Sequence, residues 1–94
     1  MLDTKKKKQL RAIAHGKSAL FQMGKEGMSD NLVKTINDSL EAHELLKISL
    51  LKTCPINVHE AAYDLASKTH SEIVQIIGRT CVLYRRSKKN KLEM

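Results

Sequence analysis

The stretch 21–30 constrains the fold most, because it combines the end of a strand, a tight loop and the start of a helix. Gly24 and Gly27 bound the loop. Ser29 is a good N-cap for the helix, because its hydroxyl can accept a hydrogen bond from an amide in the first turn. A strand followed at once by a capped helix predicts a β-α unit. The free amides and the dipole at the start of that helix favour an anion beside the loop.

The rest of the chain alternates between helical and strand periodicity. We expect helices over 4–15, over 30–42 and from Asn57 onward, and strands over 17–23, 44–52, 73–77 and 80–84. Asn57, with Glu60 three residues on, is the predicted cap of the third helix. On the first helix, Leu10, Ile13 and Ala14 form a narrow apolar stripe that we expect to be buried. Gly78 is first in the two-residue loop between the last two strands, which suits a type II′ hairpin turn.

The order α-β-α-β-α-β-β predicts an α/β fold, a single compact domain over 1–94 with a four-stranded mixed sheet packed with three helices. The β-α-β links favour parallel pairing with right-handed crossovers, and the last two strands should pair antiparallel. We expect residues 86–94, which are polar and rich in lysine, to form a mobile basic tail.

Charge is distributed unevenly along the chain, whose net charge is +7. Residues 1–28 carry seven basic and two acidic side chains, residues 29–72 carry four and seven, and residues 73–94 carry six and one. If the fold brings the two ends to one side, they form a basic surface suited to a polyanion. The alternative is two solvated basic tails.

No arrangement of side chains typical of catalysis or metal binding is present. The four histidines lie on different predicted elements without metal-ligand spacing, so we expect neither a metal nor a cofactor. Cys54 and Cys81 show no CxxC spacing, and we expect two free thiols in a reducing compartment, with Cys81 in the core. The sequence therefore does not indicate an enzyme.

No apolar run approaches the roughly 18 residues that a membrane span needs, and no apolar stretch of a signal peptide follows the basic start. We expect a cytoplasmic, monomeric protein with no membrane partner. A trimmed organellar protein is the alternative.

The loop from Gly24 to Gly27 is a weak indication taken alone, because many tight turns contain two glycines. It lacks the spacing and the terminal Lys-Ser/Thr of a P-loop. Its nearest physical analogue is the GXXG loop of KH domains, where glycines let a nucleic-acid backbone approach closely. Lys25 adds a charge for phosphate, whereas Glu26 opposes tight phosphate contact unless its side chain points away.

The aromatic residues limit how RNA could be recognised. Only Phe21, Tyr63 and Tyr84 are aromatic, so a base-stacking platform of the RRM type is not expected. Binding should instead depend on phosphates and RNA shape, with a strong salt dependence.

Four segments in a fixed order resemble one known family. They are Lys8–Arg11 with Ala14–His15, then Phe21–Gly27, His43–Ile48 and Val74–Arg85. Together they resemble the YhbY-type proteins, which are stand-alone CRM domains (chloroplast RNA splicing and ribosome maturation). The chain departs from the family pattern at Ala19, where many members have proline, and in its lysine-rich ending.

The resemblance implies a fold similar to the C-terminal domain of the third translation initiation factor, with an RNA-binding GxxG loop. It also implies RNA of large-ribosomal-subunit precursors as the partner. The implied RNA-binding residues are Gly24, Lys25, Glu26 and Gly27 in the loop, with Lys7, Lys8, Arg11, Lys17, Arg79 and Arg85 on a flanking basic surface.

The resulting hypothesis is a non-enzymatic RNA-binding protein that assists assembly of the large ribosomal subunit. Three alternatives remain open at this point: a general RNA chaperone without ribosomal preference, a protein-binding adaptor, and a small enzyme acting on RNA. Dependence on nuclease, dependence on salt and turnover with a divalent metal distinguish them.

Overall fold

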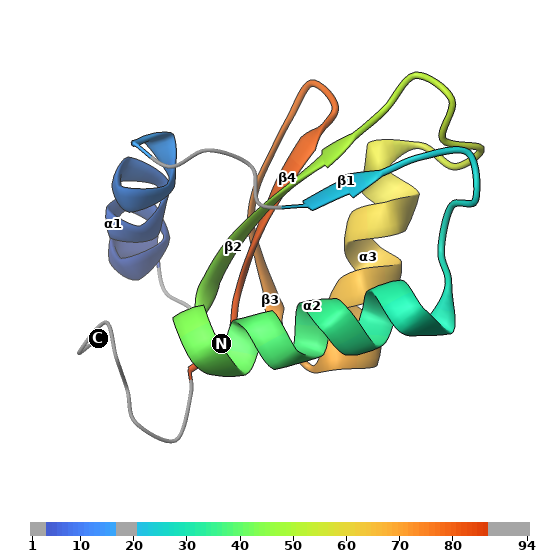
Figure 1. Cartoon of the computed structure of the whole chain (residues 1–94). Helices are drawn as coiled ribbons and strands as arrows, with labels where there is room; N and C mark the ends of the chain where they lie inside the picture. Colours follow the sequence, from blue (N-terminus) through green and yellow to red (C-terminus); the bar gives the residue numbers. More distant parts are fainter. Residues whose placement is uncertain (1–3, 17–20, 87–94) are drawn as a thin grey trace.

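The computed structural model describes residues 4–16 and 21–86, and every structural statement below refers to these residues. The predicted α-β-α-β-α-β-β order is confirmed in a single α/β domain (Figure 1). The elements are α1 (Thr4–His15), β1 (Phe21–Met23), α2 (Asp30–His43), β2 (Leu45–Leu50), α3 (Val58–Thr69), β3 (Glu72–Ile77) and β4 (Thr80–Tyr84).

The sheet is mixed, as predicted, with strand order β1-β2-β4-β3. β1 pairs parallel with β2, whereas β4 pairs antiparallel with both β2 and β3. Across the second β-α-β link, β2 and β3 run parallel as predicted, but their predicted direct pairing is wrong, because β4 lies between them. Burial explains this order: four of the five β4 residues are buried, whereas β3 contains a single buried residue and suits an edge.

Helices α2 and α3 cover one face of the sheet. Their buried side chains, among them Ile36, Leu40 and Leu65, pack with Ile48 and Leu83 in the larger hydrophobic core. Both helices begin at the predicted caps. Ser29 accepts a hydrogen bond from the Leu32 amide at 3.1 Å, and Asn57 accepts one from the Glu60 amide at 2.8 Å.

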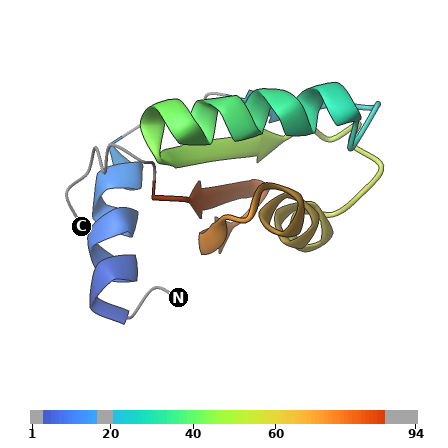
Figure 2. The same ribbon diagram turned by 90° about the horizontal axis from the view of Figure 1, so that it is seen from below.

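Helix α1 packs on the opposite face, and Figures 1 and 2 show it set apart from α2 and α3. Leu10 and Ala14 form a second hydrophobic cluster with the strand residues Leu45, Val74, Val82 and Tyr84. Ile13 was predicted to share this stripe but is 38% exposed. The buried stripe instead follows the spacing 7, 10, 11 and 14, with the half-buried basic residues Lys7 and Arg11 beside the apolar ones.

Several element boundaries differ from the prediction. β2 begins after Glu44, because Glu44 has a positive φ of 67° and its amide caps α2 by donating to the Leu40 carbonyl at 2.8 Å. It ends at Leu50, because the chain then turns, with the Cys54 amide bonded to the Leu51 carbonyl at 3.0 Å. For the first strand, only residues 21–23 can be compared, because residues 17–20 of that prediction lie outside the described part. Residues 87–94 of the predicted tail also lie outside it.

The hairpin between β3 and β4 has the predicted turn residues. Gly78 has a φ of 56°, and a type II′ turn requires a positive φ at this first position. β3 also contains an irregularity between Ile73 and Gln75, so that Val74 and Gln75 both lie on the α1 side of the sheet.

Candidate nucleic-acid interface

Three loops meet at one end of the sheet. Met23, the last residue of β1, pairs with Leu50, the last residue of β2. The Leu50 amide in turn donates to the Arg79 carbonyl in the β3–β4 turn at 2.7 Å. The loops 24–29 and 51–57 and the turn 78–79 therefore lie side by side (Figure 1), and we call this surface the loop end.

The glycine loop forms a turn in which the Gly27 amide donates to the Gly24 carbonyl at 3.0 Å. The turn exposes both Lys25 and Glu26. Exposed amides in such a turn, together with the lysine ammonium, can bind a phosphate oxygen. Since Glu26 is also exposed, solvation of its carboxylate lowers its repulsion toward a phosphate.

The two glycines serve different purposes. Gly27 has a φ of 63°, and a Cβ there would lie 3.1 Å from Pro55 Cγ in the neighbouring loop. Gly24 has no such constraint from the protein, since a Cβ there would meet Leu51 Cδ1 at an ordinary 3.6 Å. Gly27 is thus required by the turn and its packing, whereas the fold itself tolerates a side chain at position 24.

Positive charge gathers at the loop end. Lys25, Lys52 and Arg79 are all exposed there, one from each of the three loops. Beside them lies a hollow of about 380 Å³ that also borders the first turn of α3. Its lining residues are Leu50–Lys52, Cys54–Val58 and Arg79.

Lys52 is a residue that sequence reasoning missed, because it was assigned to the second strand. The turn-forming residues that follow it, 53–55, are the feature that could have placed it in the loop.

Arg85 lies at the opposite end of the sheet, where Tyr84 pairs with Leu45 and Glu72. Its guanidinium donates to the Thr69 carbonyl at 2.8 Å and to the Asn37 carbonyl at 2.9 Å, and it lies 3.4 Å from the Glu41 carboxylate. It also donates to the Asn37 side chain. The structure therefore does not bring Arg85 together with the glycine loop, and its side chain joins α2, α3 and β4 instead.

The basic residues of α1 form a separate group. Lys8 is exposed, whereas Lys7 and Arg11 are half-buried on the helix whose Leu10 and Ala14 pack with Leu45 and Tyr84. Helix α1 thus lies on one face of the sheet, toward the end away from the glycine loop (Figure 1). Lys17, the remaining predicted basic residue, lies outside the described residues. The predicted basic surface is divided into the loop end, with Arg79, and the α1 group.

The buried side chains with shifted pKa values, Cys81 and Tyr84, have structural roles. Burial raises the pKa of the Cys81 thiol from 9.0 to about 11, so the thiol stays protonated near neutral pH and is a poor nucleophile. Burial, with the Glu44 carboxylate nearby, also raises the pKa of Tyr84. Within residues 4–16 and 21–86, no group of three or more metal-ligating side chains occurs. Each helix among the described residues is too short or too polar to span a bilayer.

Fold and sequence together define the class of domain. The sequence profile of the CRS1 / YhbY (CRM) domain matches residues 2–85, so the chain belongs to this family, as the four segments predicted. It is 45% identical over 91 residues to Probable RNA-binding protein YqeI of Bacillus subtilis, covering 97% of this chain and 95% of that protein. It is 28% identical over 93 residues to an RNA-binding protein of Haemophilus influenzae, covering 99% and 94%.

A solved structure has the same fold. The solution structure of SAV1595 from Staphylococcus aureus, described as a candidate RNA-binding protein, superposes with a TM-score of 0.82. The two chains are 43% identical, and the match covers 98% of this chain and 96% of the other.

Proposed function

We propose that this protein binds RNA without acting as an enzyme. Its partner is ribosomal RNA in precursors of the large ribosomal subunit. It assists the assembly of that subunit in the cytoplasm, as a monomer. The observation that carries the proposal is the loop end, where the glycine turn meets Lys25, Lys52 and Arg79. Membership of the CRM family and the names of the relatives support RNA as the polyanion.

The geometry suits an RNA backbone. One phosphate would approach over Gly24, where no Cβ intervenes, and accept hydrogen bonds from the exposed turn and from Lys25. The ammonium of Lys52 and the guanidinium of Arg79 would contact neighbouring phosphates. Contacts of this kind hold a backbone in position and carry no base sequence, so affinity should fall steeply with salt.

The first test is the behaviour of a Lys25→Ala/Lys52→Ala variant in sucrose gradients of cell extracts. The wild-type protein should sediment with large-subunit precursors, and the folded variant should move to the top of the gradient. In filter binding to single-stranded RNA, loss of two phosphate contacts should reduce the slope of log K against log salt by about 1.4. The matched control is Lys34→Ala/Lys68→Ala, which removes two exposed lysines from α2 and α3.

Three results would contradict the proposal at different levels. Unchanged co-sedimentation of the folded variant would remove the loop end from the mechanism. Association that survives nuclease treatment would favour a protein-binding adaptor. RNA crosslinks spread over messenger RNAs, without enrichment in ribosomal RNA, would favour a general RNA chaperone.

A further inference from the structure

Helix α1 covers only part of its face of the sheet. Its cluster includes Leu45, Val82 and Tyr84, but the next residues on this face toward the loop end are polar. The register places Gln22 beside Ser49 and Ser49 beside Thr80, so these side chains share the surface between α1 and the loop end. At its edge, Ile77 is 61% exposed and adds apolar surface to this part of the sheet.

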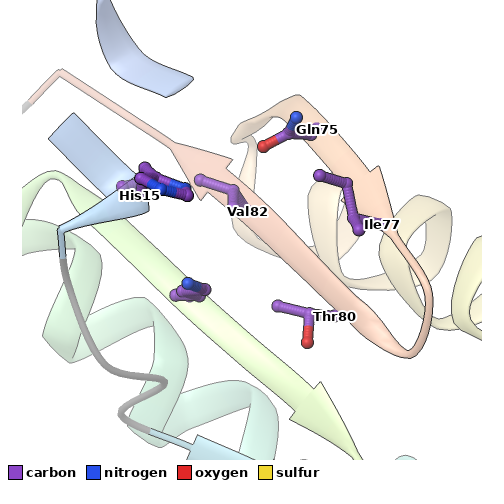
Figure 3. A pocket seen from close by; sticks show the side chains of 7 residues that line it. His15, Gln75, Ile77, Thr80 and Val82 are labelled. Atoms are coloured by element: carbon purple, nitrogen blue, oxygen red, sulfur yellow. The ribbon is translucent and has the colours of Figure 1, made fainter. Parts of the chain in front are cut away.

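This open part of the sheet contains a pocket of about 270 Å³. Figure 3 shows His15 on one side, Gln75, Ile77 and Thr80 on the other, and Val82 between them. The lining residues are Ala14, His15, Lys47, Gln75, Ile77, Thr80 and Val82. His15 is the last residue of α1 and Thr80 follows Arg79, so the pocket lies between the two basic groups.

The lining chemistry fits a nucleobase. Val82, Ala14 and Ile77 supply apolar contact area, and the His15 imidazole can stack on a base. The Gln75 amide offers a donor and an acceptor together, and the Thr80 hydroxyl offers either, as the polar edge of a base requires. Among the described residues that line the pocket none carries a carboxylate, so a nearby phosphate would meet no lining anion.

We propose that this pocket receives one unpaired base of the bound RNA while the backbone of the same strand runs between α1 and the loop end. The inference rests on the proposed RNA binding and deepens it, because it assigns the single-stranded part of the RNA to a defined site. The volume is near the lower limit of about 300 Å³ for small-molecule sites, which suits a ligand the size of one base. The charge on both sides of the pocket favours a polyanion as the occupant.

The experiment is NMR titration of the isotope-labelled whole chain with eight-residue oligonucleotides of rA, rC and rU, and separately with the four free nucleoside monophosphates. Amides of Gln75, Ile77, Thr80 and Val82 and the His15 ring should shift with at least one oligonucleotide. Gln75→Ala and Thr80→Val should each weaken binding of that oligonucleotide by about tenfold. The slope of log K against log salt should not change, because no phosphate contact is removed.

Thr35→Val is the matched control, because it makes the same change at an exposed position of α2. This variant should bind the oligonucleotide as tightly as the wild type does. Oligonucleotide binding that shifts only the loop end and α1 would overturn the base pocket while leaving RNA binding intact. Equal shifts with free monophosphates at the same concentration would also overturn it, because the site would then be a nucleotide site unconnected with RNA. Absence of any RNA binding, by contrast, would overturn the proposed function itself.

Discussion

At the residue scale, the two loop glycines separate a folding requirement from a binding requirement. Gly27 has a left-handed backbone conformation, and a Cβ there would crowd Pro55, whereas Gly24 has neither constraint. The two glycines of the GxxG loop therefore meet different physical requirements, which single substitutions can distinguish.

We expect Gly27→Ala to lower the free energy of unfolding by about 1–2 kcal/mol, because a Cβ is strained at this φ and meets Pro55. Gly24→Ala should change it by less than about 0.5 kcal/mol, because a Cβ there makes only an ordinary contact with Leu51. It should weaken RNA binding, because the added methyl group keeps an RNA backbone from approaching the turn as closely as it can approach glycine. Urea unfolding and filter binding of both variants measure these effects. Equal stability of the two variants would contradict the distinction.

At the element scale, α1 shows how a basic helix can also be part of the core. Lys7 and Arg11 are half-buried and share the helix face of Leu10 and Ala14. Long basic side chains can lie on such a face, because their aliphatic stems tolerate burial while their charged ends stay in water. The prediction from apolar residues alone placed Ile13 on the buried face of α1, where it is not found. That face is completed by long basic side chains, which an apolar pattern leaves out.

We therefore expect Leu10→Ala to lower the free energy of unfolding by about 2–5 kcal/mol, since the Leu10 side chain is completely buried between helix and sheet. Ile13→Ala removes a comparable apolar side chain from an exposed position and should cost less than about 1 kcal/mol. Thermal unfolding followed by circular dichroism provides the comparison. Similar costs for both would mean that α1 packs through a different stripe.

The strand order is also decided at this scale. β4 is buried on both faces, and the centre of a sheet is where such a strand loses the most contact with water. The two-residue turn keeps β3 beside it, so β3 becomes the edge and β2 becomes the other neighbour. The rule that strands joined by a helix pair directly does not predict that β4 lies between β2 and β3.

At the scale of the whole molecule, Arg79 and Arg85 lie at opposite ends of the sheet and have different roles. Arg79 is exposed in the turn at the loop end, and Arg85 is bonded to groups of α2 and α3 at the other end. The side chain of Arg85 is 19% exposed, so removing it leaves the Thr69 carbonyl without this donor in a partly buried place.

We expect Arg85→Ala to lower the free energy of unfolding by about 1–3 kcal/mol and to leave the RNA affinity of the folded protein within twofold of the wild type. Arg79→Ala should show the reverse: stability within about 0.5 kcal/mol, but weaker RNA binding and a salt slope less steep by about 0.7. The two variants serve as controls for each other. A loss of RNA affinity in folded Arg85→Ala equal to that in Arg79→Ala would contradict the separation.

Much of the architecture could be predicted because it depends on neighbours within a few residues. Helix periodicity, the Ser29 and Asn57 caps and the positive φ of Gly78 are all local, and the structure confirms each. The glycine loop and its place before a helix could be identified for the same reason. The end of β2 could not, because it depends on how the chain turns toward the neighbouring loops.

The sequence by itself thus determined the order of elements, their caps and turns, and the presence of a glycine loop beside positive charge. Only the tertiary structure decided which charges share a surface with that loop. Lys52 joins it and Arg85 does not, because Arg85 is bonded to Asn37, 48 residues away along the chain. Contacts between such distant residues arise from burial and strand pairing, which no local pattern encodes.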